Sequence, residues 1–185
     1  MSKICIGVIA GSLRKASYSK RVARYVAGLF PADFAATFID LADLPMYNQD
    51  LDDEGAAPEA WTAFRRTVAA QDAFLFVTPE YNRSFPAVLK NALDIASKPA
   101  GANQWAGKPA ALISQSPGNL GGALANQHIR QPMNFLGLKL MAQPEQMIAE
   151  VATVLGADGE ITSEHKRSSL AAFAEAFAGW VRENA

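Results

Sequence analysis

The chain is organised around the stretch Gly11-Ser12-Leu13-Arg14-Lys15-Ala16-Ser17-Tyr18-Ser19, which separates a short apolar run from a helical pattern. The run, residues 4–9, is continuous and rich in β-branched side chains, as expected of a strand buried on both faces of a parallel sheet. Apolar residues then recur at helical spacing up to residue 30. The stretch is therefore predicted to connect a central strand to a helix.

Such a connection favours a bound phosphate group. The first N–H groups of a helix are unpaired and its dipole is positive at that end. Ser12, Ser17 and Ser19 would add hydroxyl donors, and Arg14 would add a charge-assisted contact. The alternative is that these serines are ordinary N-caps and turn residues.

The composition indicates an ordinary globular enzyme or binding protein. With 185 residues, of which 50% are apolar, we expect a single domain over residues 1–185. A net charge of -1 gives no basic field for nucleic acid, and the apolar runs are too short to cross a membrane, so we expect small-molecule partners. The N-terminal residues lack the pattern of a secretory signal, which predicts a cytoplasmic protein. Cys5 is the only cysteine, so we expect inert packing there and no disulfide within the chain.

The rest of the chain alternates strand and helix patterns. Further strands are predicted over residues 34–41, 73–78, 110–114 and 138–141, with amphipathic helices between them and a last helix near the C-terminus. This alternation predicts an α/β three-layer sandwich, in which helices cover both faces of a parallel sheet of five strands. The expected order is the flavodoxin-like 2-1-3-4-5.

Three loops then share one rim of the predicted sheet, because the carboxyl ends of parallel strands lie together. The second loop, Pro79-Glu80-Tyr81-Asn82-Arg83-Ser84-Phe85-Pro86, follows the third strand. The third loop, Gln115-Ser116-Pro117-Gly118-Asn119-Leu120-Gly121-Gly122, follows the fourth, and its glycines permit close approach to a flat ligand. Residues 42–58 form a longer loop, in which Met46, Tyr47 and Asn48 either line the edge of a ligand or belong to a solvated excursion.

Taken together, the three loops resemble the NADPH-dependent FMN reductase family, which includes quinone, chromate and azo-dye reductases. The resemblance covers nearly the whole chain and rests on the strings Gly11-Ser12-Leu13-Arg14, Pro79-Glu80-Tyr81-Asn82 and Ser116-Pro117-Gly118 in this order. It implies FMN as cofactor and NADPH or NADH as electron donor. It also implies a homodimer or homotetramer.

The resemblance assigns roles to particular residues. The FMN phosphate would be held by Ser12, Arg14, Ser17 and Ser19. The isoalloxazine ring would be cradled, largely through main-chain groups, by Pro79, Glu80, Tyr81 and Asn82, with Ser116 and Gly118 beside it. Many family members have an aromatic residue where this chain has Arg83, and often asparagine in place of Ser19.

The substrate would meet Tyr81, Asn82 and Arg83. Arg83 would attract the phosphates of the nicotinamide cofactor or an anionic substrate such as chromate; the alternatives are a salt bridge to a partner subunit and a solvated charge.

These assignments predict two-electron ping-pong transfer through FMN from NAD(P)H to a quinone or a similar acceptor, with the chemistry carried by the flavin and no catalytic residue in the protein. The alternative is a non-catalytic flavin-binding electron carrier or regulatory module.

The sequence after the first strand contains neither a Rossmann dinucleotide motif nor a P-loop. His128 and His165 have no partners at metal-ligand spacing, so no metal site is predicted. Mixed polar faces on the third and fourth helices suit a symmetric interface. Arg130 with Glu145 is a candidate ion pair between subunits; the alternative is two separate solvated charges.

Overall fold

A parallel sheet forms the frame of the molecule, of which the computed structural model describes residues 3–185. Its long strands are β1 (Ile4–Ala10), β2 (Phe34–Ile39), β3 (Ala73–Pro79) and β4 (Pro109–Gln115). The order across the sheet is β2-β1-β3-β4-β5, and the pairings are parallel. The predicted flavodoxin-like order is therefore confirmed.

The fifth position of the sheet differs from the prediction. Two short strands, β5 (Lys139–Leu140) and β6 (Gln146–Ile148), both pair with β4, so the described residues form six strands instead of five. The chain between them contains Pro144, which has no N–H to donate to a strand ladder and so interrupts the pairing.

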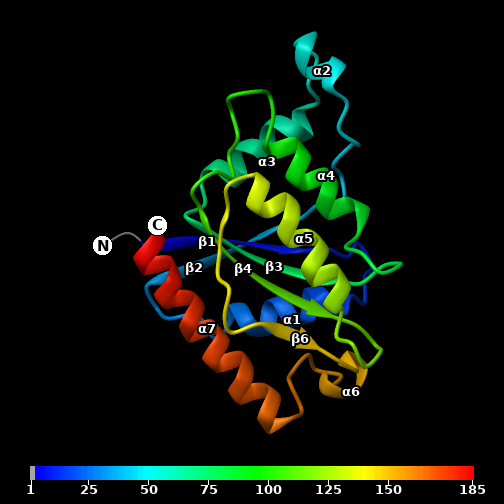
Figure 1. Ribbon diagram of the computed structural model, residues 1–185, viewed down its shortest axis with the longest axis vertical. Coiled ribbons are helices and arrows are strands. Elements are labelled where there is room, and N and C mark those ends of the chain that lie inside the picture. The colour runs from blue at the N-terminus through cyan, green and yellow to red at the C-terminus, as the bar shows by residue number, and fades with distance from the viewer. Residues whose placement is uncertain (1–2) are drawn as a thin grey trace.

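Helices cover both faces of the sheet and complete the predicted three layers (Figure 1). On one face lie α1 (Tyr18–Ala27) and the long α7 (Glu164–Asn184). The other face carries α3 (Glu59–Ala69), α4 (Ala87–Ala96) and α5 (Ala123–Phe135).

The two faces have separate hydrophobic cores, because successive side chains of a strand point to opposite sides. On β1, Ile6 and Val8 pack with α1 and α7, whereas Ile9 packs with α3 and α4. Each of these three side chains is almost fully buried. Strands with buried residues on both sides are what the continuous apolar runs of the sequence predict.

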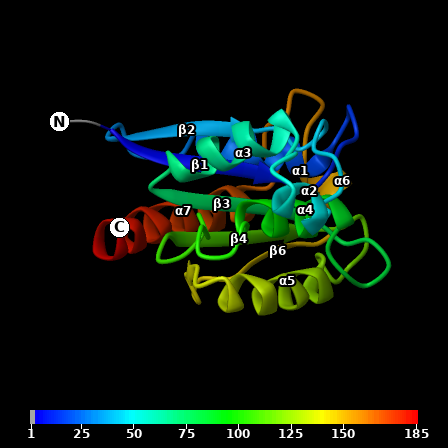
Figure 2. The same cartoon turned by 90° about the horizontal axis from the view of Figure 1, so that it is seen from above.

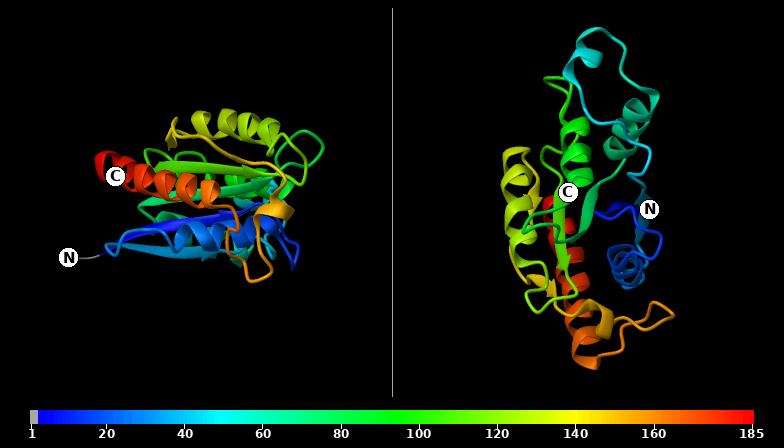
Figure 3. Two further views of the ribbon diagram at one scale, coloured as in Figure 1. Left: turned by 90° about the horizontal axis from the view of Figure 1, so that it is seen from below. Right: turned by 90° about the vertical axis from the view of Figure 1, so that its right-hand side faces the viewer.

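The loops that follow the strands gather at one end of the sheet. In Figure 2 the strands run from left to right, and the loops after β1 and β3 lie at the right-hand end. The right-hand view of Figure 3 looks onto this rim. Cys5 lies near the amino end of β1, away from the rim, and is partly exposed.

Two short helices were not predicted. Within residues 42–58, α2 (Gln49–Asp53) begins at Asn48, whose side chain accepts a hydrogen bond from the backbone N–H of Asp50. The other, α6 (Val151–Val154), follows β6. Neither is long enough to show a helical apolar period, which is the signal that identifies helices in a sequence.

Candidate cofactor site

The first loop has two serine hydroxyls held by backbone N–H groups. Ser12 Oγ accepts from the N–H of Arg14 at 3.4 Å. Ser17 is the N-cap of α1, and its Oγ accepts from the N–H of Lys20 at 3.2 Å. Both serines thus have a local structural role, as in the N-cap alternative. An accepting hydroxyl still has its own hydrogen to donate to a ligand.

The second loop contains a tight turn with unusual backbone angles. Tyr81 and Ser84 exchange two backbone hydrogen bonds, of 2.8 and 3.0 Å. Between them Asn82 and Arg83 have φ values of 49° and 66°, a region that residues other than glycine rarely adopt. Two successive positive φ values are typical of a type I′ turn, and such strain often accompanies a functional site.

Glu80 connects this turn to the neighbouring helix. Its Oε2 accepts from the backbone N–H groups of Leu124 and Ala125 at 3.0 and 3.2 Å, in the first turn of α5. The other oxygen, Oε1, lies 3.7 Å from the Arg83 guanidinium. Because the residue at the helix N-cap, Gly122, has no side chain to offer, Glu80 supplies the capping carboxylate from another loop.

The third loop is fixed to the last part of the sheet. The N–H of Ser116 donates to the carbonyl of Ile148, and its own carbonyl accepts from Val151. The carbonyl of Gly118 accepts from the N–H of Glu150 and from the Ser116 hydroxyl. The unpredicted β6 and α6 therefore support this loop.

The three loops meet around one cavity of about 200 Å³. It is lined by Ser12, Arg14, Ser17 and Tyr18 from the first loop and α1, by Pro79, Glu80 and Tyr81 from the second loop, and by Gln115 and Pro117 from the third. The first loop thus meets two loops that are more than sixty residues away from it in the sequence, as the shared rim predicts.

Three lining residues, Tyr18, Gln115 and Pro117, were not predicted as site residues, and Gln115 is the most informative of them. It is buried, its Nε2 donates to Ser19 Oγ at 3.0 Å, and its Oε1 has no hydrogen-bond partner among the described residues. A buried oxygen without a donor is costly, and a bound ligand or water would supply the missing donor. Gln115 is the last residue of β4, and the end of a strand next to a glycine-rich loop was the signal that could have identified it.

Other predicted residues lie beside the cavity without lining it. Ser19 is fully buried and holds Gln115 in place. Asn82 and Arg83 form the tip of the turn, while Ser116 and Gly118 form the backbone of the third loop.

The neighbouring segments have other contacts. In the long loop the Tyr47 ring packs on Trp61, with ring centroids 5.2 Å apart, whereas Met46 is exposed and Asn48 caps α2.

His128 Nδ1 lies 3.2 Å from Ser84 Oγ. Arg130 and Glu145 come within 3.5 Å of each other in one chain, so the ion pair predicted between subunits forms within the subunit.

Membrane-spanning helices and metal-holding clusters are both absent from residues 3–185. No helix there has the length and apolar content needed to span a membrane. Nor does that part of the chain contain a cluster of three or more histidine, cysteine, aspartate or glutamate side chains arranged to hold a metal ion.

Known proteins resemble this chain along nearly its whole length. A quinone reductase from Pseudomonas putida is 45% identical over 179 residues, which cover 97% of this chain and 95% of that protein. A 2-hydroxy-1,4-benzoquinone reductase from Burkholderia is 46% identical over 178 residues, 96% of each protein. The structure of FerB, a flavoenzyme NAD(P)H:(acceptor) oxidoreductase from Paracoccus denitrificans, superposes with a TM-score of 0.91 at 37% identity and covers 98% of both chains.

The family model for NADPH-dependent FMN reductases matches residues 4–153, which include all three loops. The resemblance seen in the sequence is confirmed, and with it the cofactor FMN and the donor NAD(P)H. The chain belongs to the NADPH-dependent FMN reductase family and is a flavin-dependent oxidoreductase.

Proposed function

We propose that this enzyme transfers two electrons from NAD(P)H to quinones, with FMN held in the cavity where the three loops meet. The observation that supports this most is the composition of that cavity, since residues with hydroxyl, guanidinium and amide groups line one space of about 200 Å³. The quinone is suggested by the names of two relatives that are 45% and 46% identical to this chain.

The first-loop part of the cavity fits a phosphate. Ser12 and Ser17 accept from backbone N–H groups, so each can donate its hydroxyl hydrogen to a phosphate oxygen. The Arg14 side chain lines the same space and would add a charged contact, and α1 begins there. Ser19 would act indirectly, by holding Gln115.

The second-loop part of the cavity fits the flavin ring. The Tyr81 side chain is 45% exposed at the mouth of the cavity, which is a suitable surface for a planar ligand. The N–H of Tyr81 is taken by Ser84, whereas those of Asn82 and Arg83 donate to no other group in the described residues. We propose that these two N–H groups bind the polar edge of the ring, with Pro79 and the main chain of Glu80 beneath it and Ser116 and Gly118 alongside.

Bound FMN supplies hydride transfer and electron storage, so the protein has to orient the substrates and leave one side of the site open. A quinone takes up two electrons and two protons; the hydride from NAD(P)H brings both electrons and one proton, and solvent provides the other. Tyr81 and Asn82 would contact the acceptor. Arg83, whose side chain is 69% exposed, would attract the phosphates of the donor. An open site of this kind would also accept chromate or azo compounds.

Steady-state assays test this function directly. The purified protein should release FMN on denaturation and should oxidise NADPH steadily when benzoquinone is added. A flavin-loaded protein that gives one stoichiometric reduction without turnover would instead support the alternative, a flavin-binding carrier or regulatory module. The expected compartment is the cytoplasm, where the partly exposed Cys5 stays reduced.

Replacing Arg14 with alanine should weaken FMN binding by about 1.5–3 kcal/mol, because one charge-assisted hydrogen bond to the phosphate is lost. The measurement is the FMN dissociation constant, obtained from the quenching of flavin fluorescence. The matched control is Lys15→Ala, an exposed cation next in the sequence that does not line the cavity. Equal FMN affinity in Arg14→Ala and Lys15→Ala would remove Arg14 from the site.

We also propose that two subunits pack through the face formed by α4 and α5. A groove of about 630 Å³ lies between these helices and contains Phe85, Pro132 and Leu136. Phe135, on the same groove, is 89% exposed. A face with both a hollow and a projecting ring can complement a second copy of itself across a two-fold axis.

The polar faces predicted for these two helices contribute several side chains to this groove. Lys90, Asp94 and Gln131 line the groove, whereas Asn91 is buried inside the subunit. Phe135→Asp should therefore shift the protein to monomers in sedimentation velocity experiments. Phe38→Asp, which changes a ring that is 52% exposed on the edge strand β2, is the control and should sediment as the wild type. Unchanged sedimentation of Phe135→Asp would contradict the proposed face.

A further inference from the structure

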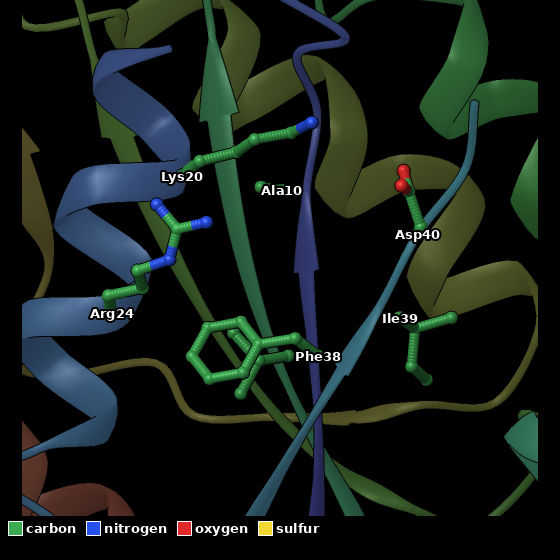
Figure 4. A pocket seen from close by; sticks show the side chains of 7 residues that line it. Ala10, Lys20, Arg24, Phe38, Ile39 and Asp40 are labelled. Carbon is green, nitrogen blue, oxygen red and sulfur yellow. The ribbon is translucent and has the colours of Figure 1, made fainter. Parts of the chain in front are cut away.

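A second pocket of about 230 Å³ lies beside α1, outside the proposed FMN cavity. It is lined by Val8 and Ala10 of β1, Lys20 and Arg24 of α1, and Phe38, Ile39 and Asp40 at the end of β2. Figure 4 shows the Lys20 and Arg24 side chains extending from α1, with the Phe38 ring below them and the Asp40 carboxylate on the far side.

The two cations of this pocket have no protein partner. Neither the Lys20 ammonium nor the Arg24 guanidinium forms an ion pair or a side-chain hydrogen bond within residues 3–185. Arg21, between them in the sequence, differs because its guanidinium donates to the carbonyl of Gly156. The pocket thus has two available positive charges against one carboxylate, Asp40.

An aromatic surface lies beside these charges. The Phe38 ring is 52% exposed on the edge strand β2, an unusual place for a large apolar side chain. The Asp40 carboxylate accepts only the N–H of Ala42 among the described residues, so its second oxygen can bind a hydroxyl or an amino group. Cations, a ring face and an acceptor together match a phosphorylated nucleoside.

The balance of charges in the pocket favours a phosphorylated ribose. In Rossmann folds an arginine near the end of the second strand recognises a 2′-phosphate, whereas an acid recognises a free 2′-hydroxyl. This chain lacks the Rossmann motif, so only the chemistry of that recognition applies here, and the pocket holds two cations and one acid. Here the end of β2 carries Asp40, and α1 faces it with Arg24 and Lys20. Lys20 lies in the first turn of α1, whose N-cap Ser17 lines the FMN cavity, so the two pockets adjoin through one helical turn.

We propose that this pocket binds the adenosine 2′-phosphate of NADPH, and that Lys20 and Arg24 make the enzyme prefer NADPH to NADH. The inference rests on the proposed function, because it concerns the donor used at that site. The adenine would lie on Phe38, the 2′-phosphate between Lys20 and Arg24, and the remainder of the donor would cross the first loop toward Tyr81. A phosphate dianion gains from both cations, which outnumber the one repelling carboxylate, Asp40, whereas the free hydroxyl of NADH gains only a hydrogen bond to that carboxylate.

Titration calorimetry with fragments of the donor tests the pocket without turnover. The probes are adenosine 2′,5′-bisphosphate and adenosine 5′-monophosphate, each added to FMN-loaded protein so that the FMN site is filled. The wild type should bind the bisphosphate about tenfold more tightly or better, the effect of a charge-assisted hydrogen bond. In the double variant Lys20→Gln/Arg24→Gln this preference should disappear. Arg66→Gln, an exposed cation on α3, is the control and should keep it.

The kinetic counterpart is the ratio of kcat/KM for NADPH to that for NADH. It should fall about tenfold or more in the double variant and stay at the wild-type value in Arg66→Gln. A double variant that keeps both the ratio and the bisphosphate preference would overturn the assignment and leave Lys20 and Arg24 as solvated charges. Failure of the proposed function is a separate result, because calorimetry needs no turnover. A flavin-loaded protein that oxidised neither donor would contradict the proposed function, and its preference between the two probes would still test the pocket.

Discussion

Replacing Gly121 with alanine is expected to lower the free energy of unfolding by about 3 kcal/mol, the sum of backbone strain and a close contact. Gly121 has a φ of +60°, and a Cβ atom built on it would lie 2.9 Å from the carbonyl carbon of Met147 and 3.0 Å from the backbone nitrogen of Ala149. Backbone atoms cannot turn aside as a flexible side chain can, so the third loop would have to move away from β6.

The chain offers a matched control for this substitution. Gly101 also has a positive φ, +83°, but no atom lies within 4 Å of the position that its Cβ would occupy. Gly101→Ala should therefore cost only the conformational part, about 1 kcal/mol. Urea unfolding followed by circular dichroism measures both variants. If Gly121→Ala and Gly101→Ala cost the same, the third loop does not lie as close to β6 as the structure indicates.

The same substitution should affect the cofactor. The carbonyl of Gly121 accepts from the buried Ser114 hydroxyl, and Gln115 and Pro117 of the proposed FMN cavity lie within six residues of it. Displacing the loop would alter the positions of both. Gly121→Ala should therefore weaken FMN binding as well as folding, whereas Gly101→Ala should leave the FMN dissociation constant at the wild-type value.

The fold was predictable because the long elements show their period in the sequence. The continuous apolar runs that became β3 and β4 are buried along their whole length, and that of β1 is buried over its residues 6–9. The helices α1, α3 and α7 follow the predicted apolar repeats. The short elements were not predictable. A strand such as β6, with three residues, is defined by its pairing with β4 and not by its own sequence.

The site was predictable to the level of loops, because every parallel strand brings its carboxyl end to one rim. What a given side chain does there depends on contacts between loops. The Glu80 carboxylate is occupied by the N-terminus of α5, and the Ser19 hydroxyl by Gln115. Neither contact has a sequence signature, since each joins residues more than forty positions apart.

Replacing Asp52 with asparagine is expected to cost about 3 kcal/mol at neutral pH, because it leaves a largely buried guanidinium without its counter-charge. Arg65 donates two hydrogen bonds to the Asp52 carboxylate, of 2.8 and 2.7 Å, and its Nε donates to the carbonyl of Ile95. The exposed fractions of the two side chains are only 12% for Arg65 and 5% for Asp52. The pair thereby ties α2 and the long loop to α3 and α4.

A double-mutant cycle separates the charge pair from the packing. Replacing both residues with apolar ones, Asp52→Leu with Arg65→Met, should cost less than either single change, because no unpaired charge then remains. Asp53→Asn, on the exposed side of α2, is the control and should change the free energy of unfolding by less than about 0.5 kcal/mol.

The pH dependence gives this second prediction an independent measurement. The hydrogen bonds from Arg65 hold the pKa of Asp52 below its ordinary value of 3.8. A carboxylate whose pKa is depressed by folding contributes stability above the pKa of the unfolded chain and loses it as the pH falls through the folded pKa. The difference in unfolding free energy between wild type and Asp52→Asn should therefore be constant from pH 7 to about 5 and should shrink below about pH 4. A difference that stays constant down to pH 3 would show that Asp52 contributes through packing and not through its charge.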